Sequence, residues 1–252
     1  MPPIKVGRTP YLSSEPLYFD MPKRGIEVQE LPPIELPIAI SDGRLHGGLI
    51  PLVDCFPLPE SMRTVAGFCV ATISRAMSVN ISTIRPLEDM TGARIAVPND
   101  APTAVKLLQV LLSLKHGVEP GALVTNQDPH DGILLVGSQG LRYRRFARGF
   151  PHQYDLGEEW YRWTGLPFVF ARFVVRSDLP TESAMLIEDS LYTSLQDWAD
   201  GVYRVSGPAG NVPMHPQDIL RYTQGIRYFT GVPEEKSMAL FGEYLGQLVG
   251  GP

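Results

Sequence analysis

The sequence predicts an α/β fold, because short apolar runs typical of strands alternate with helical segments along its 252 residues. Residues 132–137 form a continuous apolar run, which is typical of a parallel strand covered on both faces. Residues 103–114 are apolar on all sides of a helix, which predicts that this helix is buried. Since 44% of the residues are hydrophobic, the chain can bury a substantial core, as one large domain or as two lobes.

The first elements follow from local pattern. Residues 4–7 form a short opening strand, and a loop follows at 10–16. A helix is expected at 36–42, where Gly43 ends it. Apolar character returns at 47–52 as a strand, and the alternation at 77–84 predicts another.

The middle of the chain shows the α/β alternation most clearly. Residues 94–97 form a strand, and the turn at 99–102 leads into the buried helix. The apolar strand at 132–137 follows, and residues 166–176 form a long strand rich in aromatic and β-branched residues.

The last part of the chain is predicted to be helical. Thr181 can cap a helix that runs toward Tyr203 with its apolar side chains on one stripe. Pro216 and Pro233 lie at plausible first-turn positions of two closing helices. A helical tail after a strand-rich middle favours a two-lobed protein.

Composition narrows the class of partner. A net charge of −5 argues against nucleic acid, which needs a concentrated basic face. No apolar run is long enough for a membrane span, and no signal peptide is visible, so a cytoplasmic protein is expected. Cys55 and Cys69 are expected to be free buried thiols, and the five scattered histidines predict no metal site.

Three stretches carry a resemblance to a known family. Residues 154–171, which contain the run Gly165-Leu166-Pro167-Phe168, closely resemble the signature of the chorismate dehydratases of the futalosine menaquinone pathway. Residues 10–17 look like that family's first loop, and residues 131–137 are similar to its central strand and following turn. The resemblance covers about residues 4–176, with a similar helical tail.

The resemblance implies an α/β, two-lobed fold like that of type II periplasmic binding proteins, with a ligand cleft between the lobes. On that template the first lobe is 1–82 plus 177–252 and the second is 83–176. It also implies a cofactor-free dehydration of chorismate to 3-[(1-carboxyvinyl)oxy]benzoate. Such a site holds a dicarboxylate mainly by orientation and electrostatics, so a small carboxylate ligand is expected, bound by a monomer or a homodimer.

The resemblance implies two catalytic positions. Ser78 matches a serine of the family's active site and would donate a hydrogen bond to the substrate; the alternative is a strand serine bonded to the neighbouring backbone. Ser13 stands where the family usually has a catalytic Asn, and its side chain is shorter with one donor instead of two.

Five further positions are implied to bind substrate: Tyr11, Thr103, Ala104, Gly137 and Ser138. Departures from the family occur around Thr103, where Pro102 replaces an Arg and Ala104 a Ser. The lost Arg would have been a bidentate partner for a carboxylate.

Other conspicuous residues have plainer interpretations. Asp100 is expected to cap the helix that follows it, and His46 to be a surface or packed residue in preference to a general base. Glu158, Glu159 and Trp160 are expected to be scaffold, with Trp160 buried on a helix.

Two other functions stay open. A small-carboxylate binding or sensing protein would keep the fold and lose the chemistry, as the changes at Ser13, Pro102 and Ala104 allow. The sister enzyme of the same pathway, which acts on a cyclised futalosine derivative, fits these patterns less well.

Overall fold

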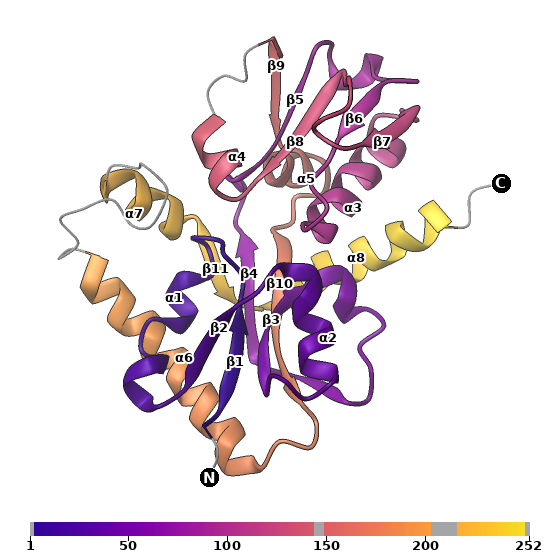
Figure 1. Ribbon diagram of the computed structural model, residues 1–252. Coiled ribbons are helices and arrows are strands. Elements are labelled where there is room, and N and C mark those ends of the chain that lie inside the picture. The colour runs from indigo at the N-terminus through magenta and orange to yellow at the C-terminus, as the bar shows by residue number, and fades with distance from the viewer. Residues whose placement is uncertain (1–2, 144–148, 203–215, 250–252) are drawn as a thin grey trace. The chain divides into compact units, whose positions relative to one another are not determined.

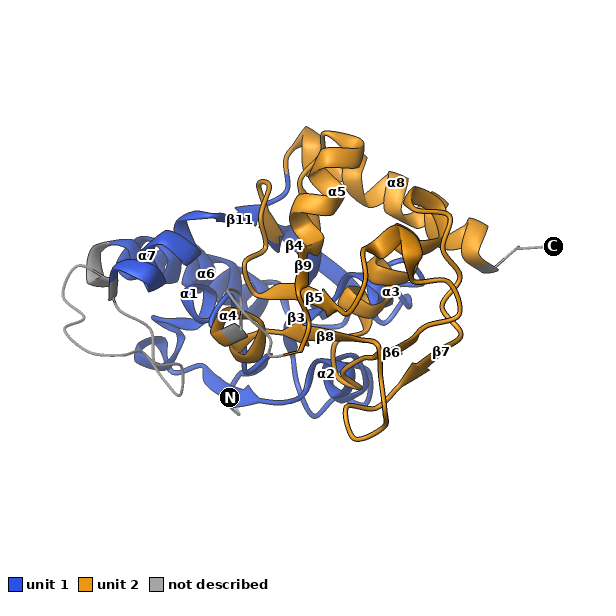
Figure 2. Ribbon diagram, turned by 90° about the horizontal axis from the view of Figure 1, so that it is seen from above, with its two compact units in different colours: residues 1–70, 170–230 blue, residues 71–169, 231–252 orange. Residues whose placement is uncertain are grey.

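The computed structural model describes residues 3–143, 149–202 and 216–249, and the chain divides into two compact units (Figures 1 and 2). Unit 1 comprises residues 1–70 and 170–230, and unit 2 comprises residues 71–169 and 231–252. The chain passes between the units within two strands, β4 (Met62–Thr72) and β10 (Phe168–Arg176), and again after residue 230.

Unit 1 is built on a six-stranded mixed sheet in the order β11-β4-β10-β3-β1-β2. β1 pairs in parallel with both β2 and β3, and β10 pairs with β3 in antiparallel orientation. Helices α1 and α6 pack against each other. The remaining elements of this unit are β1 (Lys5–Arg8), α1 (Glu15–Tyr18), β2 (Glu27–Glu30), α2 (Leu36–Ser41), β3 (Gly47–Pro51), α6 (Thr181–Val202), α7 (Pro216–Gln224) and β11 (Ile226–Phe229), with 3-10 turns at Met21–Arg24, Pro33–Glu35 and Leu52–Cys55.

Unit 2 is built on a five-stranded sheet in the order β7-β6-β8-β5-β9. β6 is parallel to β7 and β8, whereas β5 is antiparallel to β8 and β9. Helix α3 packs against α5 and α8. The elements are β5 (Val79–Thr83), a 3-10 turn (Leu87–Asp89), β6 (Arg94–Ala96), α3 (Pro102–Val110) continued by a π-helical turn (Leu111–Lys115), β7 (Ala122–Val124), β8 (Gly132–Val136), α4 (Ser138–Tyr143), β9 (His152–Asp155), α5 (Leu156–Thr164) and α8 (Val232–Val249).

Each sheet has its own core. In unit 1, Val6, Leu17, Ile40 and Phe173 are fully buried. In unit 2 the largest fully buried side chain is Trp160, whose ring has edge-to-face contacts with neighbouring aromatic rings of α5, β10 and α8. Burying one such ring contributes several kcal/mol, on the order of 3–5 by large-to-small substitution.

The alternation read from the sequence is confirmed at most of its elements. The expected strands at 4–7, 47–52 and 132–137 correspond to β1, β3 and β8, and the helix at 36–42 to α2. The expected buried helix at 103–114 is α3 with its π-helical turn, and its residues 107, 108, 110, 111 and 112 have no exposed surface.

Five strands were not predicted, namely β2, β4, β7, β9 and β11, and in β4 the middle of the strand breaks the pattern. Ala66 and Gly67 have positive φ values of 40° and 78°, so the strand carries an irregularity within its 11 residues. The carbonyl of Gly67 accepts a hydrogen bond from the amide of Thr230 at 2.9 Å, which ties this irregularity to the end of β11.

The unit boundaries differ from the expected lobes of 1–82 plus 177–252 and 83–176. Strand β5 belongs to unit 2 because β8 and β9 pair with it on both sides. Helix α8 also belongs to unit 2, since its Phe241 packs against Trp160 and its Ser237 Oγ accepts a hydrogen bond from Trp160 Nε1 at 3.0 Å.

Candidate functional site

Four strands of unit 2 begin or end at the same end of its sheet, where the parallel strands β6 and β8 have their carboxyl ends. β6 and β8 are parallel, so the loops that follow them leave from one edge, and they lead to Thr103 and Gly137. β5 is antiparallel to β8, with Val79 opposite Val136, so Ser78 enters β5 at that edge. β9 is antiparallel to β5, so Asp155 at its end lies there too. Ligands of open α/β sheets bind at this kind of edge.

Ser78 is held in a tight turn. Its amide donates to the carbonyl of Ala76, two residues earlier, at 2.6 Å, and Met77 between them has a φ of 57°. This pattern is a γ-turn with positive φ, which is rare and strained for a residue with a side chain. The Ser78 hydroxyl lies 3.3 Å from the same carbonyl, and the residue is 7% exposed. Strain of this kind concentrates at functional sites.

The carboxylate of Asp155 accepts hydrogen bonds from the backbone amides of this turn. Its Oδ1 accepts from the amide of Ala76 at 2.9 Å, and its Oδ2 accepts from the amide of Met77 at 2.7 Å. Oδ1 also accepts from the amide of Glu158 at 3.1 Å and so caps α5. Burial raises the pKa of Asp155, while the three amides and the nearby Arg75 act in the opposite direction.

An amide side chain links this turn to α4, and a glycine in α4 allows the close approach. Asn80 Nδ2 lies 2.8 Å from the carbonyl of Met77 and 3.1 Å from that of Gly140 in α4. A Cβ on Gly140 would lie 2.1 Å from the carbonyl oxygen of Ser78, so only glycine allows α4 this close. Gly137, at φ 62°, makes the bend from β8 into α4, and Ser138 begins that helix half-buried.

The first turn of α3 lies at the same edge. Thr103 and Ala104 are buried, at 4% and 3% exposure, and follow the N-cap residue Ala101 and the first helical residue Pro102. The expectation that Asp100 caps this helix is wrong, because α3 starts one residue later and, among the described residues, no side chain caps it. The first amides of a helix have no acceptor inside the helix and favour an anion.

Tyr11 and Ser13 lie in unit 1, in the loop between β1 and α1. The loop is tightly bonded: Ser14 Oγ lies 3.0 Å from the carbonyl of Thr9 and 2.7 Å from that of Tyr11. The carbonyl of Ser13 accepts from the hydroxyl of Tyr228 at 3.1 Å, and Ser13 itself is half-buried. The backbone of Ser13 is therefore fixed, and a different side chain there changes reach without changing the loop.

The plainer interpretations hold for the other conspicuous residues. His46 lies at the start of β3, at the opposite end of that strand from Pro51, and its Nδ1 accepts from the amide of Lys5 at 3.0 Å. Since β1 and β3 are parallel, His46, which precedes β3, lies at the opposite end of the strands from Ser13, which follows β1. Glu159 is buried and paired with Lys115, its Oε2 lying 2.5 Å from Nζ, so it belongs to the scaffold.

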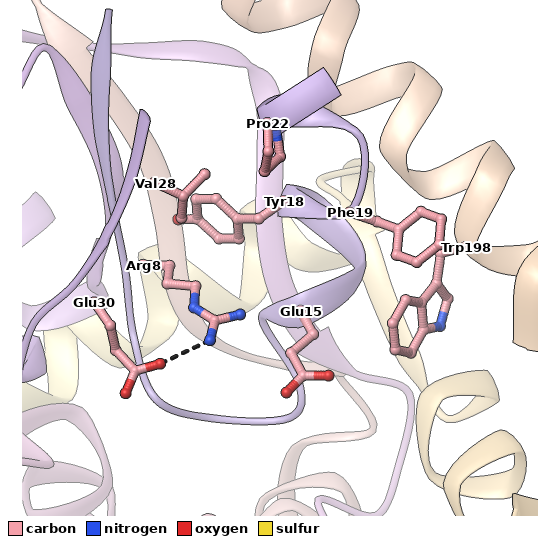
Figure 3. Close-up of a pocket in the computed structure, with 8 residues that line it drawn as sticks. All are labelled: Arg8, Glu15, Tyr18, Phe19, Pro22, Val28, Glu30 and Trp198. Atoms are coloured by element: carbon pink, nitrogen blue, oxygen red, sulfur yellow. Dashed lines mark hydrogen bonds and ion pairs between the residues drawn. The ribbon is translucent and has the colours of Figure 1, made fainter. Parts of the chain in front are cut away.

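A cavity of about 360 Å³ in unit 1 has the wrong charge for a dicarboxylate (Figure 3). Its charged groups are one guanidinium, Arg8, and two carboxylates, Glu15 and Glu30, and Arg8 is already paired with Glu30 at 2.8 Å. Burial raises the pKa of Glu15. Phe19 and Trp198 form an aromatic wall with ring centroids 5.5 Å apart. The one cation that lines this cavity, Arg8, is already paired with Glu30, so the cavity does not suit a dicarboxylate.

The described residues also bear on other chemistries. Within 3–143, 149–202 and 216–249, no three or more His, Cys, Asp or Glu side chains are grouped to hold a metal ion. Burial raises the pKa of the Cys55 thiol to about 12, so it is not a thiolate nucleophile at neutral pH. None of the described helices is long and apolar enough to cross a membrane.

Comparison with known proteins gives one family and one fold. A family model described as menaquinone biosynthesis matches residues 4–247. The chorismate dehydratase of Thermus thermophilus is 25% identical over 267 aligned residues, covering 98% of this chain and 96% of that protein.

Two solved structures share the fold at lower identity. Protein AF1704 from Archaeoglobus fulgidus aligns with a TM-score of 0.69 and 15% identity, over 98% of this chain and 97% of that one. The CA3427 gene product of Candida albicans, described as having the generic periplasmic binding protein fold, aligns with a TM-score of 0.58 and 10% identity, over 98% and 94%. The expected fold class, α/β and periplasmic-binding-protein-like, is therefore confirmed.

Proposed function

We propose, since this chain belongs to the menaquinone biosynthesis family, that it is a carbon–oxygen lyase that dehydrates chorismate or a related cyclic carboxylate. The observation that carries the proposal is the position of Ser78, the first turn of α3 and the Gly137 bend at the same end of the strands of the unit 2 sheet. The similarity to the Thermus dehydratase supports the substrate class.

The reaction needs few titratable groups. The bond from a ring carbon to its hydroxyl breaks, the adjacent carbon that carries the enol ether loses a proton, and the hydroxyl leaves as water. The ring becomes aromatic, giving 3-[(1-carboxyvinyl)oxy]benzoate from chorismate. Aromatisation supplies the driving force, and a substrate carboxylate can take the proton, so the protein mainly has to orient a dianion and stabilise its leaving group.

The residues at the edge suit these two tasks. The positive end of the α3 helix dipole, at Thr103 and Ala104, can attract a carboxylate without an arginine, which matters because Pro102 stands where the family has one. Ser78 can donate a hydrogen bond to the leaving oxygen, and Gly137 and Ser138 border the same end of the sheet. Tyr11 and Ser13 are assigned to the substrate by the family resemblance.

The test is direct turnover. We expect the purified chain to convert chorismate to the aromatic enol ether, followed by ultraviolet absorbance and chromatography. Ser78→Ala should lower kcat by about 10²–10³-fold, the usual effect of removing a positioned donor. Ser82→Ala, a buried serine further along the same strand, is the matched control and should retain the rate. Equal loss in both variants would contradict the role of Ser78.

A binding or sensing function is the second candidate, and Ser13 and Pro102 favour it. It predicts that chorismate stabilises the protein against heat and is recovered unchanged. Thermal shifts with chorismate, 3-hydroxybenzoate and matched neutral analogues would establish the ligand class, since a ligand stabilises the folded state only through its own affinity. Equal stabilisation by the neutral analogues would contradict a carboxylate site.

A further inference from the structure

The second residue of the Tyr154–Ala171 stretch that marks the family, Asp155, is a buried carboxylate bonded to the turn before Ser78. Asp155 is 6% exposed, and the pairing of β9 with β5 places it beside Asn80 at the start of β5. Its two oxygens accept three backbone amides, two of which belong to the turn before Ser78. Capping α5 needs only the third, so the other two bonds call for another explanation.

The backbone conformation of the turn before Ser78 is unfavourable on its own and needs support from other residues. Met77 has a φ of 57°, a conformation that an L residue with a Cβ adopts only under external constraint. The Ser78 amide and hydroxyl both point back to the carbonyl of Ala76, so the direction of the Ser78 side chain depends on the geometry of this turn. The Asn80 side-chain amide donates hydrogen bonds to the carbonyl of Met77 and to the carbonyl of Gly140 in α4, and so links the turn to that helix.

The α5 N-terminus is shaped to receive the turn. A Cβ on Gly157 would lie 2.8 Å from the amide nitrogen of Ala76 and 3.1 Å from Thr72 Oγ1, so the first turn of α5 lies directly against the backbone before Ser78. Asp155 and Gly157 thus act together: the glycine permits the approach, and the carboxylate fixes its register through directed bonds.

We propose that Asp155 is a positioning residue for the Ser78 hydroxyl, acting through the γ-turn at Met77 and not through the substrate. The inference rests on the proposed function, because it assigns Ser78 to the reacting hydroxyl. The family stretch thereby has a role in the chemistry, although it lies far from Ser78 in the sequence.

The decisive variant is Asp155→Ser. Serine caps a helix about as well as aspartate, so α5 keeps its cap. Its hydroxyl is too short to reach the Ala76 and Met77 amides as well, so the turn loses both bonds. We expect kcat to fall on the order of 10²-fold, the cost of a misplacement of about 1 Å in a positioned group, with KM changed by less than about threefold.

A matched control removes a buried charge from the same helix without touching the turn. Glu159→Gln breaks the pair with Lys115 and should lower stability while kcat per folded molecule stays near that of the natural chain. Rescue then distinguishes positioning from general damage: Met77→Gly in the Asp155→Ser background should recover about tenfold in kcat, because glycine adopts positive φ without steric cost.

Hydrogen exchange read by mass spectrometry keeps the test independent of turnover. In the natural chain the amides of residues 76–78 are bonded, so a peptide covering 74–80 should exchange at least about tenfold faster in Asp155→Ser and unchanged in Glu159→Gln. Unchanged exchange in Asp155→Ser, or a kcat loss no larger than that of Glu159→Gln, would overturn the proposal. If the natural chain turned over no chorismate, the proposed function would fail while exchange still decided whether Asp155 holds the turn.

Discussion

Replacing Gly140 with alanine should damage the site by a predictable amount. The added Cβ would lie 2.1 Å from the carbonyl oxygen of Ser78, 2.6 Å from its carbon and 2.9 Å from the carbonyl oxygen of Leu135. All three are backbone atoms, which cannot swing aside as the end of a side chain can. Ordinary contact requires α4 or the Ser78 peptide to move by about 1 Å, and overpacking of this kind costs about 1–3 kcal/mol.

The consequence for activity follows from the same displacement. A shift of about 1 Å in a positioned catalytic group costs on the order of 10² in rate, so kcat should fall about that much while the fold survives. The assays are urea denaturation for the free energy of unfolding and chorismate turnover for kcat.

A second glycine in unit 2 provides the control. Gly246 lies in α8, and nothing among the described residues lies within 4 Å of a Cβ added there. Gly246→Ala should therefore stabilise the protein by up to about 1 kcal/mol, the helix-propensity difference, and leave the rate unchanged. A Gly140→Ala variant as stable and as active as the natural chain would show that the close approach of α4 to Ser78 is not what fixes the serine.

Three more perturbations test separate parts of the structure. Trp160→Ala should cost about 3–5 kcal/mol in urea denaturation, because a fully buried ring is lost; a cost under 1 kcal/mol would refute its place in the core. Lys23 and Arg24 lower the pKa of Asp20 below its ordinary 3.8, so the stability this carboxylate contributes is present above pH 3.8 and lost as pH falls through its folded pKa. Asp20→Asn should accordingly be less stable near neutrality and show a flatter loss in acid, which urea midpoints across pH would measure. Ser13→Asn should raise the rate on chorismate by about 10²–10³-fold if the family's longer amide is what the natural chain lacks; tight carboxylate binding with no gain in turnover would decide for the binding function.

Local pattern was enough to predict most of the secondary structure. Apolar runs and turn residues placed β1, β3, β8 and α3 because those elements are regular and buried, so their burial shows in the sequence itself. β4 escaped because positive φ at Ala66 and Gly67 interrupts its alternation. The attachment of α8 to unit 2 rests on contacts between Trp160 and Phe241, which are 81 positions apart and leave no local signal.

The residues of the candidate site also come together through strand pairings between distant parts of the sequence, which local pattern does not predict. The family resemblance singled out Ser78, Thr103 and Gly137, whereas local pattern placed Ser78 and Gly137 within expected strands at 77–84 and 132–137 and Thr103 at the start of an expected helix. In the structure all three lie at or near the loops that precede or follow strands. Which of those loops meet depends on strand order and direction. Because β5 runs antiparallel to β8, a residue before one strand and a residue after the other become neighbours.

The role of Asp155 depends on one more step of that kind. A carboxylate before a helix is a familiar capping signal, and capping accounts for one of its three bonds. The other two exist because β9 pairs with β5 and brings the end of one strand against the turn before the other. A turn with positive φ at a methionine gives no signal in composition or periodicity. The residue that makes such a turn possible can therefore be found only from the structure, at the carboxylate that accepts the amides of the turn.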